Sequence, residues 1–261
     1  MKRTLLEAPP YGLPLSALNF IGDARIYDSS CSPEARVYFI DKEDGFYLKT
    51  APLGTLKREA EMTQYFFKKG LGVEIISYEQ AEFDMMISKR ALGEDCTHAV
   101  YLSDPKRLCD KMAELLRTLH EMDHSDCPVK DRMTEYVSLA EANYESGNYD
   151  TSHFPDSFGY RSAEEAYLQF SSGKSLFKNE VLLHGDFCLP NIMLNGWEFS
   201  KFIDLGNGGV GDRHVDLFWG SWTLGFNLKT NEFNERFLDA YGRDKIDDEI
   251  LKTVAAAEVF G

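Results

Sequence analysis

Three short apolar runs between residues 181 and 205 constrain this chain most, because each run adjoins a polar side chain suited to chemistry. The runs and their polar residues are 181–183 before Asp186, 192–194 after Asn191, and 199–205, in which Phe202-Ile203 leads into Asp204. Asn195-Gly196 separates the second run from the third, and an Asn-Gly pair between two β-rich runs predicts a tight hairpin. Such a hairpin would return the chain so that Asp204 comes beside Asn191.

Asp186, Asn191 and Asp204 together suit phosphoryl transfer. That reaction needs a carboxylate near the attacking hydroxyl and oxygen ligands that hold Mg²⁺ on the phosphates of a nucleotide. Asp186 is therefore a candidate base or orienting group, and Asn191 and Asp204 are candidate metal ligands. The alternative is that each Asp only caps a turn after a buried strand. That alternative explains one such residue better than a set at spacings of five and thirteen.

The chain of 261 residues is strongly acidic, with 28 Lys and Arg against 43 Asp and Glu and a formal net charge of −15. This length allows one large domain or two lobes. The charge argues against nucleic acid as a partner, because nucleic-acid recognition depends on basic side chains. It favours a cationic small molecule, whose local concentration an acidic field raises, although solubility alone accounts for the same excess.

No segment of the sequence predicts secretion or membrane insertion. Glu7 and Pro9-Pro10 interrupt the amino terminus before an apolar core develops, so it does not read as a signal peptide. No apolar run approaches the ~18 residues that span a bilayer. We therefore expect a cytoplasmic protein without a membrane partner.

The cysteines and histidines predict no metal site. The five cysteines are scattered without CxxC spacing, which indicates neither zinc binding nor a disulfide framework. Cys188 lies two residues after Asp186 but is flanked by apolar residues, so we expect it to pack rather than to act as a nucleophile. His120 and His124 have an i, i+4 spacing that can bind a metal, but no third ligand is evident.

A lysine in the amino-terminal part of the chain needs a partner. Residues 36–40 and 46–50 predict two strands joined by a tight turn, and Lys49 lies in the second of them. An ammonium in an apolar strand is costly unless it is paired, although an edge strand would let it reach water. The helix predicted over residues 56–69, with Thr55 as its cap, offers Glu59, with Glu61 as the rival partner.

His184-Gly185-Asp186-x4-Asn191 followed by Ile203-Asp204-Leu205-Gly206 resembles the catalytic and metal-binding motifs of the aminoglycoside phosphotransferases, specifically the 3'-phosphotransferase branch. The resemblance implies an α+β, protein-kinase-like fold with a β-rich N-terminal lobe over residues 1–89 and a mainly helical C-terminal lobe over 90–261. It implies transfer of the γ-phosphoryl of ATP (or GTP), with Mg²⁺, to a hydroxyl of an aminoglycoside. The expected position is the 3'-hydroxyl, and the expected consequence is antibiotic resistance.

The same resemblance implies roles for residues in both lobes. Nucleotide contacts are expected from Lys49 with Glu59 on the phosphates, Tyr47 over the adenine, Ser88 to Ala91 facing the purine, and Ser32 in a nucleotide-positioning loop. Acceptor contacts are expected from Asp150, Asp156, Asn207, Glu258 and the terminal Gly261. Support of the catalytic loop is expected from His184 and Asp216.

Two departures from the family keep other functions open. The segment 147–160 supplies only two acids where the family has a cluster, and Asn207 and Trp222 stand where family members often carry arginine. These departures suit a kinase of the same chemistry that acts on another hydroxylated metabolite or drug. A nucleotide-binding scaffold without turnover is the other alternative, which the complete set of Lys49, Asp186, Asn191 and Asp204 disfavours.

Overall fold

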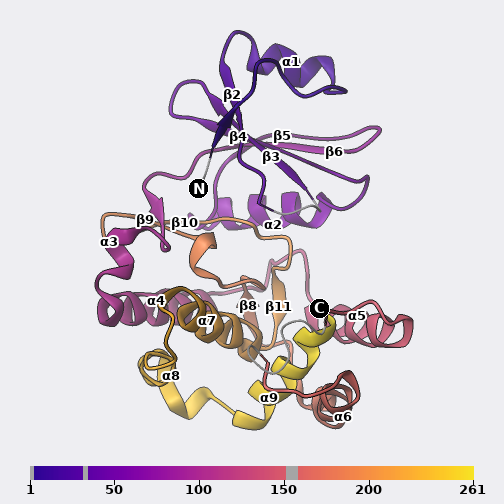
Figure 1. Ribbon diagram of the computed structural model, residues 1–261, viewed down its shortest axis with the longest axis vertical. Helices are drawn as coiled ribbons and strands as arrows, with labels where there is room; N and C mark the ends of the chain where they lie inside the picture. Colours follow the sequence, from indigo (N-terminus) through magenta and orange to yellow (C-terminus); the bar gives the residue numbers. More distant parts are fainter. Residues whose placement is uncertain (1–2, 32–34, 151–157) are drawn as a thin grey trace. The chain divides into compact units, whose positions relative to one another are not determined.

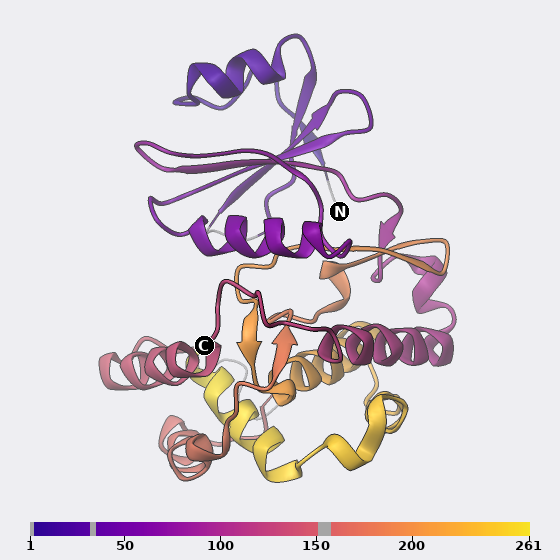
Figure 2. The same cartoon turned by 180° about the vertical axis from the view of Figure 1, so that it is seen from behind.

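A computed structural model describes residues 3–31, 35–150 and 158–261, which divide into two compact units. The first unit comprises Met1–Gly93 and Ser200–Gly206, and the second comprises Glu94–Phe199 and Asn207–Gly261. Residues 200–206 fall within the predicted C-terminal lobe, over 90–261, but pack with the first unit. Figures 1 and 2 show the elements of the units from opposite sides.

The first unit is built on a six-stranded antiparallel sheet with the order β1-β2-β3-β4-β6-β5 (Figure 1). Its strands are β1 (Thr4–Leu5), β2 (Arg25–Asp28), β3 (Arg36–Asp41), β4 (Phe46–Ala51), β5 (Ile75–Gln80) and β6 (Asp84–Lys89). Lys49 lies on β4 opposite Val37 of β3 and Met86 of β6. The lysine predicted to lie on a strand is therefore in the interior of the sheet, not at its edge.

Helices cover both faces of this sheet (Figure 1). Successive side chains of a strand point to opposite faces, so β4 contributes to two cores. Leu48 packs in a cluster with Ile21 of α1 (Leu15–Ile21). Ala51, three residues on, packs with Ala60 of α2 (Lys57–Lys68). Lys49 has the parity of Ala51 and therefore belongs to the face that carries α2.

The start of α2 differs from the sequence prediction. Thr55 was expected to cap the helix, but its hydroxyl donates to the Pro52 carbonyl at 2.7 Å. The backbone N–H of Leu56 instead donates to the buried carboxylate of Asp84, on β6, at 2.8 Å. The cap prediction was wrong because a distant carboxylate, and not the local hydroxyl, satisfies the end of the helix.

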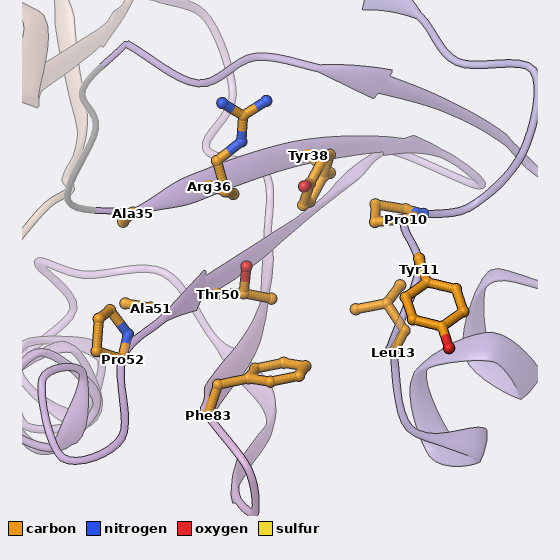
Figure 3. A pocket seen from close by; sticks show the side chains of 10 residues that line it. All are labelled: Pro10, Tyr11, Leu13, Ala35, Arg36, Tyr38, Thr50, Ala51, Pro52 and Phe83. Carbon is orange, nitrogen blue, oxygen red and sulfur yellow. The ribbon is translucent and has the colours of Figure 1, made fainter.

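A surface cavity of about 410 Å³ opens on the first unit (Figure 3). It is lined by Pro10, Tyr11, Leu13, Ala35, Arg36, Tyr38, Thr50, Ala51, Pro52 and Phe83. Tyr38 and Thr50 have the parity of the face that carries α1, opposite to the face of Lys49. Tyr47, Lys49, Glu59, Ser88 and Ala91, which are predicted to bind nucleotide, are not among the residues that line this cavity.

The second unit is mainly helical. Its helices are α3 (Ala99–Leu102), α4 (Pro105–His120), α5 (Arg132–Ser146), α6 (Ala163–Gly173), α7 (Arg213–Leu228), α8 (Asn234–Gly242) and α9 (Asp248–Ala257). On α4, Leu108, Met112 and Leu119 are buried at helical spacing, and Asp104 caps the start of the helix just before a proline.

Short strands in the second unit position the motifs. β8 (Val181–Leu183) pairs with β11 (Gly209–Gly211), and a second sheet has the order β10-β9-β7, with β7 at Glu94–Asp95. The predicted hairpin is confirmed: β9 (Ile192–Asn195) and β10 (Glu198–Phe202) are neighbours, and Gly196 between them has a φ of 64°. The chain passes from the second unit to the first within β10.

Candidate active site

Lys49 lies at the centre of a three-residue ionic cluster in the first unit. Its Nζ is 2.7 Å from Oε2 of Glu59 and 2.9 Å from Oδ1 of Asp204. β4 supplies the ammonium, the first turn of α2 supplies Glu59, and the segment after β10 supplies Asp204. The structure therefore selects Glu59 over Glu61 as the partner of the lysine.

Burial and charge act on this cluster in opposite directions. The Lys49 side chain is only 18% exposed, and burial disfavours its charged form. The carboxylates of Glu59 and Asp204 outweigh that cost, so the pKa of Lys49 is raised and the ammonium stays charged. Burial also raises the pKa of Glu59 against the attraction of Lys49. The result is a fixed positive charge between two acids.

Asp204 has a backbone that L-residues rarely adopt, with a φ of 59°. Asp tolerates the left-handed region better than most residues. Gly206, two residues after Asp204, lies close to Glu59, since a Cβ added to Gly206 would be 3.6 Å from the Cβ of Glu59. The Asp204 side chain is 52% exposed although one of its oxygens binds Lys49. Its carboxylate can therefore bind Lys49 and still accept a further ligand.

Tyr47 lies two residues before Lys49, on the same face of β4 by strand parity. Its ring centroid is 5.4 Å from that of Phe39, and its hydroxyl accepts a hydrogen bond of 2.9 Å from Arg3. The Arg3 guanidinium also lies 3.5 Å above the Phe39 ring, a cation–π contact that the sequence analysis missed. Tyr47 pairs with Ser88 of β6 in the strand register. Of the other predicted nucleotide contacts, Ala91 is buried and Ser32 lies outside the described residues.

Asp186 and Asn191 are bonded to each other in the second unit. The Asn191 amide donates through Nδ2 to the Asp186 carbonyl at 3.1 Å and to the Asp186 carboxylate at 2.8 Å. The backbone N–H of Asp186 donates to Nδ1 of His184 at 3.3 Å. Both bonds of Asn191 use its nitrogen, so they do not require the amide oxygen, which is the atom that a hard cation would bind.

Asp216 anchors the loop that carries these residues. Its carboxylate accepts the backbone N–H groups of His184 and Gly185, each at 2.8 Å. It also lies 3.1 Å from Nε2 of His120, whose Nδ1 is 2.8 Å from the Tyr241 hydroxyl. Burial lowers the pKa of His120, although Asp216 opposes that shift. His120 therefore contributes to the support of the loop through Asp216. Within the described residues, no group of three or more His, Cys, Asp or Glu side chains could hold a metal ion.

The sequence of the chain matches that of known phosphotransferases. The profile of the phosphotransferase enzyme family matches residues 33–251. A probable aminoglycoside 3'-phosphotransferase from Lactococcus lactis subsp. lactis (strain IL1403) is 52% identical over 250 residues, which cover 95% of each chain. The chain belongs to the aminoglycoside phosphotransferase family. The predicted family and enzyme class, a nucleotide-dependent kinase, are therefore confirmed.

Solved members of the aminoglycoside phosphotransferase family have the same fold. A type VIII aminoglycoside 3'-phosphotransferase superposes with a TM-score of 0.79 at 22% identity, covering 95% of this chain and 97% of that chain. An aminoglycoside phosphotransferase from Streptomyces rimosus ATCC10970, in complex with ADP and streptomycin, superposes with a TM-score of 0.67 at 19% identity, covering 86% and 90% of the two chains. These likenesses confirm the predicted α+β kinase-like fold.

Two of the residues predicted to contact the phosphoryl acceptor, Glu258 and Asn207, form hydrogen bonds within the protein. Glu258 follows α9, and its Oε1 accepts hydrogen bonds from the Tyr136 hydroxyl at 2.8 Å and from Nε1 of Trp219 at 3.2 Å. Burial raises the pKa of Glu258 to about 7 against these two bonds, and the Asp186 carboxylate adds to the rise. The backbone carbonyl and side-chain oxygen of Asn207 accept from Arg132, a partner that the sequence analysis missed.

The remaining acceptor predictions have fewer described contacts. Asp150 and Gly261 are exposed, and Asp156 lies outside the described residues. The carbonyl of the adjacent Phe260 accepts a hydrogen bond of 2.7 Å from Asn143 of α5. The chain terminus is therefore held against α5, where Figure 1 also places it.

Cys188 is buried two residues after Asp186. Burial raises the pKa of its thiol, and the Asp186 carboxylate raises it further. A thiol that resists ionisation is a poor nucleophile. Its position agrees with the expected packing role.

No helix in the parts of the chain that the structure describes combines the length and apolar character needed to cross a bilayer.

Proposed function

We propose that this protein transfers the γ-phosphoryl group of ATP to a hydroxyl of an aminoglycoside, with the 3'-hydroxyl as the expected position, and that its host thereby gains resistance. The cluster in which Lys49 binds both Glu59 and Asp204 is the observation that carries the proposal. A buried ammonium held by a helix carboxylate is the arrangement that kinase-like enzymes use to bind α- and β-phosphates. The bonded pair of Asp186 and Asn191 supplies the remaining groups.

The donor set fits Mg²⁺. Asp204 offers a carboxylate that is half exposed, and Asn191 offers an amide oxygen that its bonds to Asp186 do not require. Mg²⁺ in kinases is bound by one or two such oxygens and by substrate phosphates, not by a cage of protein ligands. Bound there, the ion would neutralise charge on the phosphates. We propose Asn191 and Asp204 as the residues that hold it.

Each protein group has a defined task in the proposed reaction. Lys49 would bind the phosphates and be held in place by Glu59. Asp186 would accept a hydrogen bond from the acceptor hydroxyl and take its proton as the phosphoryl group is transferred. Tyr47 would cover the adenine. Most of the rate enhancement would come from positioning and charge neutralisation, since the transferred group passes through a loose transition state.

Residues expected to contact the acceptor are already bound within the protein. Glu258 and Asn207, two of the residues expected to contact it, already bind Tyr136, Trp219 and Arg132. Trp222, which stands where family members often carry arginine, packs between Trp219 and Phe226 at centroid distances of 5.4 and 5.0 Å. These contacts favour, as a second candidate, a kinase of the same chemistry with another hydroxylated acceptor.

Product analysis tests the proposal directly. Purified protein with Mg·ATP would be assayed against kanamycin, neomycin, a 3'-deoxy analogue of one of these antibiotics, and simple amino alcohols, with the phosphorylated position assigned by NMR. We expect turnover of the first two and loss of turnover with the 3'-deoxy analogue. Equal turnover of the analogue would refute the 3' assignment, and turnover of the amino alcohols alone would favour the second candidate.

A thermal-shift measurement separates an enzyme from a scaffold. Stabilisation by Mg·ATP is expected in either case, because any ligand that binds the folded state stabilises it. Stabilisation without product from any acceptor would favour a nucleotide-binding scaffold. Growth on kanamycin of a strain that expresses this chain would test the proposed resistance.

A further inference from the structure

The segment that follows Gly206 packs against the start of α5. The backbone N–H of Val210 donates to the Val129 carbonyl at 2.8 Å. Gly209 lies against the same residue, since an added Cβ would be 2.7 Å from a Val129 side-chain carbon. The segment 207–211, which includes β11, therefore packs closely against residues 129–132 within one unit.

Arg132 makes the most specific contact of this docking. It is the first residue of α5 and is 8% exposed. Its Nε donates to the carbonyl of Asn207 at 3.1 Å, and its Nη2 donates to the Asn207 side-chain oxygen at 3.3 Å. A third nitrogen lies 3.5 Å from the exposed carboxylate of Glu135. A buried guanidinium is costly unless its donors are satisfied in a fixed geometry, so this two-point contact restrains Asn207.

Asn207 in turn contacts the catalytic loop. An added Cβ on Gly185 would lie 2.0 Å from the Asn207 carbonyl oxygen, so the two backbones touch. The backbone N–H of Gly185 donates a hydrogen bond of 2.8 Å to the Asp216 carboxylate. The residue immediately before Asp186 is therefore confined between the Asp216 carboxylate and the Asn207 carbonyl, which Arg132 holds.

Electrostatics places Arg132 in the same neighbourhood as the proposed base. Burial raises the pKa of Glu258; the Asp186 carboxylate adds to that rise and the positive charge of Arg132 opposes it. Burial raises the pKa of Tyr136, which bonds to Glu258, and the positive charge of Arg132 opposes that rise. The charges of Arg132 and Asp186 therefore both act on Glu258, and all three residues belong to the second unit.

We propose that Arg132 is a positioning residue for phosphoryl transfer, which holds Asn207 against Gly185 and so keeps the Asp186 carboxylate directed at the acceptor hydroxyl. The inference rests on the proposed function. It assigns Arg132 an indirect role, because the guanidinium acts through Asn207 and not on the reacting atoms. Restraint of the base affects the chemical step, whereas Lys49 and Tyr47, the proposed contacts to the phosphates and the adenine, belong to the first unit.

The test compares the wild-type chain with Arg132→Ala, Arg132→Lys and the control Arg161→Ala. Arg161 is an exposed arginine of the same unit that pairs only weakly with Glu165, at 3.3 Å. Two readouts are measured: amide hydrogen exchange of the peptide 184–189, and steady-state turnover of kanamycin with Mg·ATP. Turnover is measured with and without added guanidinium ion, which can occupy the space that Arg132→Ala vacates.

We expect Arg132→Ala to speed exchange in 184–189 and to lower kcat at least about tenfold with little change in the KM of ATP, because small misplacement of a catalytic group costs rate. Guanidinium ion should restore part of the lost kcat. Arg132→Lys keeps the positive charge but loses the two-point contact with Asn207. It should therefore recover less than half of the kcat that is lost in Arg132→Ala. Arg161→Ala should match wild type in both readouts.

Wild-type exchange and kcat in Arg132→Ala would overturn the proposal. Arg132→Ala could also lose kcat while exchange rises throughout the chain and guanidinium restores no activity. That result would overturn the proposal too, because it would indicate a general structural role for Arg132. If Arg132→Ala does not fold, Arg132→Lys decides by the same two readouts. If the wild-type chain phosphorylates no acceptor, the proposed function fails, and local exchange in 184–189 still decides the role of Arg132.

Discussion

The side-chain amide of Asn191 donates a hydrogen bond of 2.8 Å to the carboxylate of Asp186. The same nitrogen also donates to the Asp186 carbonyl at 3.1 Å. One amide thus connects the backbone and the side chain of the proposed base, and it belongs to a proposed metal ligand. The orientation of the base and the position of the metal ligand are therefore coupled, which makes Asp186 the first residue to test.

Asp186→Asn should lower kcat by roughly 10²–10⁴-fold, the usual contribution of a positioned general base. The substitution keeps the size of the side chain and removes its ability to take a proton. The affinity for Mg·ATP should change little, and isothermal titration beside steady-state kinetics measures both quantities. Asp110→Asn, at an exposed ion pair with Arg236, is the control and should behave as wild type. Near-normal kcat in Asp186→Asn would exclude the proposed base.

Lys49→Met should raise the KM of ATP by about tenfold or more, because a phosphate-binding charge is lost. The unbranched side chain keeps the packing on β4, while Glu59 and Asp204 lose the cation between them. Removing one partner from a buried ion pair typically costs about 3–5 kcal/mol, so the free energy of unfolding should also fall. Lys252→Met, at an exposed ion pair with Glu249 on α9, should leave both quantities near wild type. Nucleotide affinity unchanged in Lys49→Met would remove this residue from the site.

Gly185→Ala should lower activity and stability more than Gly196→Ala. Both glycines have positive φ, 84° and 64°, so an alanine at either costs about 1–2 kcal/mol of backbone strain. At Gly185 the added Cβ would also meet the Asn207 carbonyl at 2.0 Å, whereas Gly196 has nothing within 4 Å. Urea unfolding and turnover of both variants measure the difference. Equal losses in the two variants would show that the close approach to Asn207 has no consequence.

Asp216→Asn should lower the free energy of unfolding by about 2–4 kcal/mol, since two buried N–H groups lose a charged acceptor. His184 and Gly185 are the donors that depend on it. Activity should fall too, because Asp186 follows Gly185 directly. Thermal and urea unfolding measure the stability, with Asp110→Asn again as the exposed control. A variant as stable as wild type would indicate that the loop does not depend on this anchor.

Glu258→Gln should alter how stability depends on pH. Burial raises the pKa of Glu258 to about 7, above the ordinary value of 4.5, so the folded protein binds a proton that the unfolded chain releases between these values. Stability from this group is therefore present below about pH 4.5 and is lost as pH rises toward 7. Glutamine does not titrate, so the variant should gain stability relative to wild type between pH 5 and pH 8. Urea unfolding across that range checks this, and parallel curves for the two proteins would contradict it.

Patterns of nearby residues predicted much of the fold. The strand that carries Lys49, the apolar stripe of α4 and the hairpin at Asn195-Gly196 all follow from periodicity and turn chemistry, which act over a few residues. Glu59 was correctly preferred over Glu61 as the partner of Lys49, on the phasing of the family motif. These features are local, and a single sequence contains what they need.

Contacts between distant residues escaped prediction. Asp84 caps α2 from a neighbouring strand, Arg3 covers Phe39, and Arg132 binds Asn207 from 75 residues away. Periodicity does not select such partners, because only the packed chain decides which buried donors meet which acceptors. Buried polar groups are nearly always hydrogen-bonded, so each can be expected to have a partner. This expectation does not identify which residue the partner is.

The sequence by itself determined the identities and spacing of the phosphoryl-transfer residues, and with them the family and the strands and helices on which they lie. The tertiary structure decided which groups hold those residues in place: Asp204 joins the pair of Lys49 and Glu59, and Asp216 anchors the loop of Asp186. The physical reason is range. Backbone preference and hydrophobic periodicity act within one element, whereas satisfying a buried charge requires partners that only the folded chain brings together.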